Sequence, residues 1–264
     1  MLCKMSLQLH FREFSEGPPL IILHGIFGSG ENWLTVSKKF SEKFRVFLPD
    51  QRNHGRSPHS PDFGYYELVE DLRQFADQRG IEKFFLIGHS MGGKVAMRFA
   101  AEFPNRLAGL VVVDIAPRLY QPHHQNVIAG LKAVDIEHSQ SRAEAEQAMA
   151  THIEEEDVRQ FLLKNLYRKE DGKFAWRINL PVLEKAVETI GENPEPIVPV
   201  SVPALFVRGA NSRYIREEDE AGIRLRFPHA QIATINGAGH WVQAEKPQEF
   251  AALVMDFLQS IENK

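Results

Sequence analysis

The sequence predicts an α/β fold, with a mostly parallel central sheet, helices on both faces of it and a helical cap as an insertion. Short apolar runs alternate with stretches whose apolar residues recur at helical spacing, as in successive βα units. This alternation stops after Pro117 and resumes near Val202. At 264 residues and 43% hydrophobic, the chain suits one large domain with an insertion. We therefore expect a core domain formed by residues 1–117 and 197–264, and a cap (lid) formed by residues 118–196.

Each expected strand of the first half is a short apolar run, and each expected helix has a periodic apolar face. Residues 7–14 alternate apolar and polar side chains, as an edge strand does. Residues 65–80 place Leu68, Leu72 and Phe75 at helical spacing. The other strands are expected at 19–24, 45–49, 83–87 and 107–113, and the other helices at 31–40 and 91–102. Right-handed connections between such strands place helices on both faces of the sheet.

The expected cap contains several helical stretches and no convincing strand. Ser141 and Glu144 have the spacing of a capping box at the start of one helix. Residues 158–167 are amphipathic, and residues 181–190 lie between helix start and stop signals. After the cap, the core is expected to continue with strands at 202–208 and 231–235 and helices at 215–227 and 247–261. A cap at this position covers the crevice at the carboxyl ends of the strands, where open α/β sheets bind ligands.

Composition and charge exclude several classes of protein. The net charge of −4, without any Lys/Arg cluster, gives no reason to expect a nucleic-acid partner. The single cysteine, Cys3, allows no intrachain disulfide, which fits a reducing compartment. No apolar stretch approaches the roughly 20 residues that span a bilayer, and the first residues lack the apolar core of a signal peptide. We therefore expect a cytoplasmic protein, and the oligomeric state stays open.

The sequence suggests no metal site and no cofactor. The acidic run at residues 154–157 is interpreted as the start of a cap helix, where the helix dipole favours negative charge. No spacing of His, Cys, Asp or Glu elsewhere is typical of a metal site. The expected partner is a small-molecule substrate.

The motif Gly88-His89-Ser90-Met91-Gly92 indicates a nucleophile. It follows an apolar strand and opens a helix, so Ser90 is expected on a tight turn with its hydroxyl exposed. Glycines are needed there because the strand and the helix leave little space for side chains. The G-x-S-x-G pattern alone also fits an idle serine in a glycine-rich turn, but the flanking strand and helix favour the nucleophile.

A serine nucleophile needs a base, and His240 is the candidate. It lies between the last strand and the last helix, after Gly239, and comes last in the order serine, acid, histidine. Three other histidines lie within turn signatures where a structural role suffices, namely His24, His54 and His89. His123 and His124 lie in the cap and could at most contact a substrate.

The acid of the expected triad is assigned to Asp114. Hydrolases of this architecture usually place it shortly after the strand that follows the cap, but residues 210–214 contain no carboxylate. Glu217 and its acidic neighbours come too late, in an expected helix. Asp114 ends the strand before the cap and faces the crevice, although it could instead cap the following turn. Asp50 is a further candidate, in a stretch that looks like a loop-organising turn.

The remaining site residues are expected to stabilise the oxyanion and to line an apolar pocket. Two backbone N–H groups are needed for the oxyanion. Met91 supplies one at a helix N-terminus. Ile26 supplies the other, with Phe27 as its alternative. The residues expected to bind the acyl group are aromatic, and ordinary core packing is the alternative for each: Phe27, Phe161, Tyr167, Trp176 and Trp241.

Four motifs make the chain resemble the α/β-hydrolase superfamily from end to end. They are residues 24–28 (HGIFG), 50–57 (DQRNHGRS), 88–93 (GHSMGG) and 239–241 (GHW). Residues 114–117 (DIAP) and 208–214 (RGANSRY) look more specifically like the YbfF-type bacterial esterases. That resemblance implies an acid after the strand preceding the cap, in agreement with Asp114. It also implies hydrolysis of short acyl esters, or of acyl-CoA thioesters, without a cofactor.

These observations lead to the hypothesis of a serine carboxylesterase with Ser90, Asp114 and His240 as its triad. The same triad also supports perhydrolysis, carbon–carbon hydrolysis or a lyase reaction. Dehalogenase and epoxide-hydrolase chemistry is not expected, since those relatives need an aspartate at the nucleophile position. A ligand-binding receptor that kept the fold is the non-catalytic alternative.

Overall fold

We describe the fold from a computed structural model, which places residues 7–122, 124–193 and 198–262. Cys3, His123 and the expected end of the cap at residue 196 lie outside these described residues. Within them, no helix combines the length and the apolar character that crossing a membrane would require.

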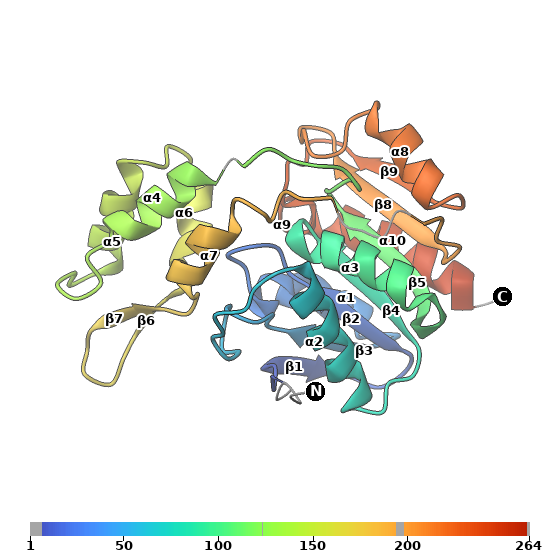
Figure 1. The fold of residues 1–264 in the computed structure, drawn as a ribbon, viewed down its shortest axis with the longest axis horizontal. Coiled ribbons are helices and arrows are strands. Elements are labelled where there is room, and N and C mark those ends of the chain that lie inside the picture. The colour runs from blue at the N-terminus through green and yellow to red at the C-terminus, as the bar shows by residue number, and fades with distance from the viewer. Residues whose placement is uncertain (1–6, 123, 194–197, 263–264) are drawn as a thin grey trace.

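The described residues form a seven-stranded sheet with the order β1-β3-β2-β4-β5-β8-β9 (Figure 1). The first strand pairs antiparallel with its neighbour, and the other pairs in the sheet are parallel. The strands are β1 (Phe11–Phe14), β2 (Pro19–Leu23), β3 (Arg45–Pro49), β4 (Phe84–His89), β5 (Leu107–Val113), β8 (Ala204–Gly209) and β9 (Gln231–Ile235). The predicted fold class is therefore confirmed, and β1 lies at an edge of the sheet, as its alternating pattern predicts.

Each central strand is buried on both faces, because helices cover both sides of the sheet. In β2, Leu20 and Ile22 pack with one cluster of core residues, whereas Ile21 and Leu23 pack with the other. This alternation explains why a parallel strand is a continuous apolar run. One face carries α2 (Tyr65–Asp77), α3 (Met91–Glu102) and α8 (Asp219–Arg226), and the other carries η1 (Gly30–Trp33), α1 (Leu34–Phe40), α9 (Val242–Glu245) and α10 (Pro247–Glu262). A short turn, η2 (Pro104–Arg106), leads into β5.

Between β5 and β8 the chain leaves the sheet and forms the cap, drawn in green to yellow beside the core in Figure 1. It contains the helices α4 (Gln125–Ala133), α5 (Arg142–Ala150), α6 (Glu156–Leu163) and α7 (Leu180–Ala186) and the antiparallel pair β6 (Leu166–Arg168) and β7 (Phe174–Trp176). The expectation of a cap without strands was wrong. The Asp171-Gly172 pair, with Gly172 at φ 83°, closes a hairpin turn, and strands of three residues leave no periodic signal.

The parallel register places the carboxyl ends of β4, β5, β8 and β9 side by side at one edge of the sheet. Ser90 follows β4 and Asp114 follows β5, while His240 lies in the loop between β9 and α9. Residues from distant parts of the sequence therefore come to the edge of the sheet at which the chain enters the cap.

Candidate active site

Ser90 occupies a sharp turn between β4 and α3. Its φ of 53° and ψ of −118° lie outside the usual regions for a residue with a side chain, and its N–H donates to the Val113 carbonyl at 3.0 Å. A Cβ atom at Gly88 would lie 2.2 Å from the Gly92 carbonyl oxygen. A Cβ atom at Gly92 would lie 2.6 Å from the carbonyl oxygen of His24. These close approaches explain the two glycines of the motif, and the backbone at Ser90 has the strain of a nucleophile elbow.

His240 is held by contacts around both its ring and its backbone. Its Nδ1 lies 2.8 Å from Asp114 Oδ2. The Tyr214 ring stacks on the imidazole with centroids 3.9 Å apart and an angle of 19°. His89 Nε2 donates to the His240 carbonyl at 2.9 Å, and burial lowers the pKa of His89 to about 3, so this partner is neutral. The Glu245 carboxylate accepts the N–H groups of the two residues that flank His240.

Asp114 is fully buried at the end of β5, with a positive φ of 50°. One carboxylate oxygen accepts the Gly209 N–H at 3.2 Å, and the other accepts the Ser212 hydroxyl as well as contacting His240. Burial raises the pKa of Asp114 to about 6, while hydrogen bonds from Ser212 and Gly209 act in the opposite direction. The loop after β8, which lacks a carboxylate of its own, therefore supplies hydrogen-bond donors to the acid on β5.

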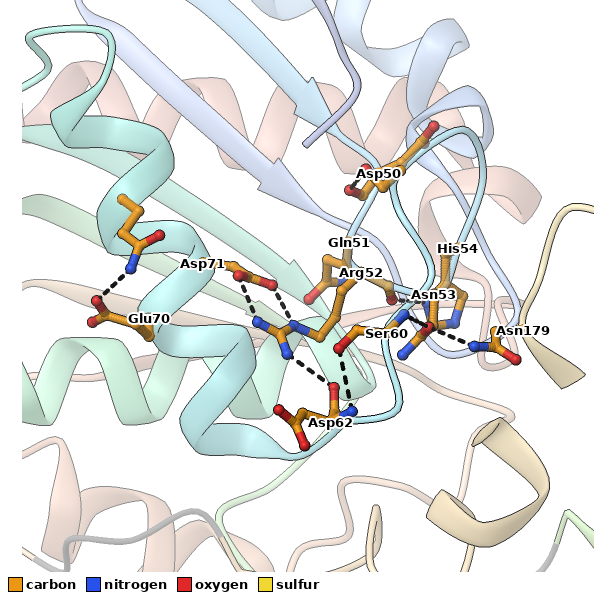
Figure 2. A network of polar contacts seen from close by, with 12 residues as sticks. Asp50, Gln51, Arg52, Asn53, His54, Ser60, Asp62, Glu70, Asp71 and Asn179 are labelled. Atoms are coloured by element: carbon orange, nitrogen blue, oxygen red, sulfur yellow. Dashed lines mark hydrogen bonds and ion pairs between the residues drawn. The ribbon is translucent and has the colours of Figure 1, made fainter. Parts of the chain in front are cut away.

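Asp50, the alternative acid, holds the loop after β3 and the start of η1. One of its oxygens accepts the Gly30 N–H at 2.8 Å, and the other accepts the Arg56 N–H at 2.9 Å. Figure 2 shows the loop that follows, in which Arg52 makes a buried ion pair with Asp71 at 2.5 Å. Asp50 thus acts as the loop-organising residue that its sequence context suggests.

His24 and His54 support the backbone of the loops after β2 and β3. Each has Nδ1 within hydrogen-bond distance of a carbonyl oxygen, so the proton sits on Nδ1 and Nε2 is an acceptor. His24 Nε2 accepts the Gln51 N–H at 2.9 Å, and His54 Nε2 accepts the Phe27 N–H at 3.2 Å. Burial lowers the pKa of both, that of His54 to about 3. The structural role expected for these histidines agrees with these contacts.

The loop after β2 forms a turn whose own hydrogen bond does not use the Ile26 N–H. Gly28 N–H donates to the Gly25 carbonyl at 3.1 Å, and Phe27, the third residue of this turn, has a φ of 60°, as a type II turn requires. Since N–H and C=O of a trans peptide point in opposite directions, the Ile26 N–H is directed away from that bond. Within the described residues, no group accepts a hydrogen bond from Ile26 N–H or Met91 N–H. Both residues line a small pocket together with Ser90.

A cleft of about 970 Å³ between core and cap contains Ser90 and His240 on its wall. Three of the five aromatic residues predicted to line the acyl pocket line this cleft: Phe27, Phe161 and Trp241. None of the five lines the small pocket beside Ser90. The rings of Phe161, from the cap, and Trp241, from the core, lie 5.2 Å apart and join the two sides. Tyr167 and Trp176 lie in the β6–β7 hairpin, paired with other hairpin residues, and do not line this cleft.

The residues that hold Asp114 and His240 in place were missed in the sequence analysis. Ser212 and Tyr214 lie within the 208–214 motif but were given no role, and Glu245 carries no motif, because the contacts of all three depend on how separate loops meet. His89 was assigned a structural role, and the structure shows which group it holds, because its Nε2 donates to the His240 carbonyl. Lys94, four residues after Ser90, is buried with its ammonium on the Gly191 and Glu192 carbonyls, and burial lowers its pKa to about 7.

Comparison with known proteins agrees with this architecture. The family described as the alpha/beta hydrolase fold matches residues 18–247, and the chain therefore belongs to that family. The sn-1-specific diacylglycerol lipase ABHD11 of Mus musculus is 42% identical over 249 residues, covering 91% of this chain and 81% of the relative. Esterase YbfF of Escherichia coli is 38% identical over 242 residues, covering 91% and 92%. A solved marine microorganism esterase is 44% identical, with a TM-score of 0.93 and coverage of 96% of this chain and all of that one.

Family and relatives together define the class of protein. It is a carboxylic ester hydrolase of the esterase/lipase type, as the sequence predicts. The resemblance to YbfF-type esterases is confirmed as well.

Proposed function

We propose that the chain is a serine carboxylesterase that hydrolyses short-chain acyl esters through Ser90, His240 and Asp114. The observation that carries this proposal is the 2.8 Å contact between Asp114 Oδ2 and His240 Nδ1. His240 lines the same cleft as Ser90, which occupies a strained turn. A buried carboxylate that fixes the tautomer of a histidine, together with a serine on such a turn in the wall of the same cleft, supports acyl transfer.

In this mechanism, the Ser90 hydroxyl attacks the acyl carbonyl while His240 Nε2 takes its proton. The Asp114 carboxylate holds the proton on Nδ1 and balances the charge of the imidazolium. The Ile26 and Met91 N–H groups donate to the oxyanion, and the helix dipole of α3 adds to the second of them. His240 then gives its proton to the leaving alcohol, and water, activated by the same histidine, hydrolyses the acyl-enzyme and restores Ser90.

The space around Ser90 supports a short acyl group. The pocket beside it is lined by apolar side chains from core and cap, including Met91, Ile115 and Val187, and leaves little free volume. The larger cleft is available to the alcohol portion of the ester. Its rim carries four carboxylates against one lysine: Glu154, Glu155, Asp157, Glu245 and Lys164. Such a rim favours an uncharged alcohol over the polyanionic coenzyme A of a thioester.

A panel of substrates tests this function. We expect p-nitrophenyl esters from acetate to dodecanoate to be hydrolysed with a preference for short chains, and acyl-CoA thioesters of equal chain length to react more slowly. Ser90→Ala should abolish turnover of each. Absence of turnover by the wild-type chain would favour perhydrolase, carbon–carbon hydrolase, lyase or receptor functions. Turnover that survives in Ser90→Ala would reject the proposed nucleophile.

We further propose that residues 1–117 and 197–264 form the core domain and residues 118–196 the cap. This division is supported by the position of the cap elements between β5 and β8. The cytoplasmic location and the lack of a nucleic-acid partner stay predictions from the sequence.

A further inference from the structure

We infer that Asn165, in the cap, is a positioning residue for the oxyanion loop, defined as residues 24–28. Its side-chain amide crosses from cap to core and donates to the Phe27 carbonyl at 2.8 Å, although the two residues are 138 positions apart in the sequence. Seating of the cap on the core would thereby set the position of the backbone that presents Ile26 N–H. This inference rests on the proposed function, because it concerns the same oxyanion site.

Phe27 is the residue of the loop whose conformation needs such support. A φ of 60° is unfavourable for a residue with a bulky side chain, and glycine is the usual occupant of this turn position. Its N–H is held from the core by His54 Nε2, and its carbonyl is held from the cap by Asn165 Nδ2. The peptide groups on both sides of Phe27 are therefore fixed, each by a different part of the molecule.

Asn165 is itself held firmly, so it can transmit the position of the cap. It is 4% exposed and lies at the junction between α6 and β6. Its backbone N–H donates to Leu162 at 3.0 Å and its carbonyl accepts from Arg177 at 2.9 Å, which ties the residue to both α6 and the hairpin. The side-chain amide also reaches the Leu162 carbonyl at 3.2 Å. Because the backbone of Asn165 is anchored within the cap, a shift of the cap would pull on Phe27.

The chain offers a matched control for this contact. Asn179, also in the cap, donates through its side-chain amide to Asn53 Oδ1 in the core at 2.9 Å, as Figure 2 shows. Each asparagine joins cap to core by one side-chain amide hydrogen bond, to which Asn179 adds a bond from its backbone N–H to the Asn53 carbonyl, and neither Asn179 bond reaches the oxyanion loop. Replacing each by leucine removes one such bond between cap and core, so a loss of kcat confined to the Asn165 variant indicates the contact with Phe27.

For Asn165→Leu we expect kcat for a short ester to fall by about 10-fold or more while KM changes little, because a displaced oxyanion donor acts mainly on the transition state. Asn179→Leu should leave kcat near that of the wild type. Thermal unfolding of both variants checks that they fold, and Asn165→Ala replaces the leucine variant if that one does not. A folded Asn165 variant with wild-type kcat, or an equal fall of kcat in Asn179→Leu, would overturn the inference.

A second measurement does not depend on esterase activity. Amide hydrogen exchange of peptides covering residues 24–28 should become faster in Asn165→Leu and stay unchanged in Asn179→Leu. Unchanged exchange in both variants would reject the inference even if the wild-type enzyme hydrolyses esters. Faster exchange in Asn165→Leu combined with an inactive wild type would instead reject the proposed function and leave the positioning contact in place.

Discussion

Asp114 and His240 are 126 positions apart in the sequence, and their side chains meet at 2.8 Å. The carboxylate that makes this contact comes from the end of β5, before the cap, and not from the loop after β8. That loop supplies Ser212 in its place, whose hydroxyl donates to the same Asp114 oxygen that contacts His240. Two neighbouring strands thus contribute to this contact. The carboxylate follows β5, and its hydrogen-bond donors come from the end of β8 and the loop after it.

The first prediction concerns this acid. Asp114→Asn should lower kcat by about 10⁴-fold, because an amide no longer holds His240 in the required tautomer or balances its charge. Steady-state kinetics on a short ester measure the effect. Asp50→Asn is the control, because Asp50 accepts hydrogen bonds from the loop backbone and lies apart from His240. Asp50→Asn should lower the thermal stability of the protein and leave kcat close to that of the wild type. Near-wild-type activity in Asp114→Asn, or an equal loss in Asp50→Asn, would reject the assignment.

A second prediction follows from the pKa of Asp114. Burial raises it to about 6, so the carboxylate gains a proton as the pH falls through that value, and kcat/KM should fall with it. Ser212→Ala removes a donor that stabilises the ionised carboxylate, which raises the pKa of Asp114 further. The acid limb of the pH–kcat/KM profile should therefore move to higher pH. Ser260→Ala, on α10, should leave the limb in place. A limb that stays or moves down in Ser212→Ala would contradict its assignment to the Asp114–His240 pair.

The aromatic pair across the cleft gives a third prediction. Phe161→Ala removes the cap side of the Phe161–Trp241 contact and widens the cleft beside Ser90. We expect kcat/KM for short esters to fall by roughly 10-fold and the preferred ester to become bulkier. Tyr167→Ala, in the hairpin and away from the cleft, should keep the wild-type order of preference. If both variants show the same change of preference, the cleft is not the substrate site.

A fourth prediction concerns the acidic rim. Repulsion between the rim carboxylates and coenzyme A should be screened by salt, so kcat/KM for an acyl-CoA should rise with ionic strength. The value for an uncharged ester should change little. The triple variant Glu154→Gln, Glu155→Gln, Asp157→Asn should raise acyl-CoA turnover at low salt and remove much of the salt dependence. A value of kcat/KM for acyl-CoA that falls as the salt concentration rises would contradict this prediction, because it would mean that the cleft attracts anions.

The features that follow from local pattern were predictable from the sequence. The bounds of α3 and β5 agree with the prediction, since a continuous apolar run and a glycine-flanked helix start are strong local signals. Ser90 and Asp114 could be selected because each ends a buried strand, and the parallel topology then brings such ends to one edge. Their roles stay proposals, and the contact between Asp114 and His240 is what the structure adds.

Features that depend on packing between distant segments were not predictable. Tyr214 stacks on His240 only because the loop after β8 passes over the loop after β9. Tyr167 and Trp176 were expected in the pocket as aromatic residues of a helical cap, but a hairpin too short for a periodic signal places them elsewhere. Asn165 has no distinguishing neighbours in the sequence, and its contact with Phe27 exists only when cap and core are assembled.

The most direct test of the account is covalent labelling of the nucleophile. The wild-type protein, treated with a fluorophosphonate, would be examined by intact mass and by peptide mapping. We predict one adduct per chain, on the peptide that contains Ser90, and none in Ser90→Ala. An adduct on another residue, an adduct that persists in Ser90→Ala, or no adduct on the wild-type chain would contradict the proposal that Ser90 is an activated nucleophile.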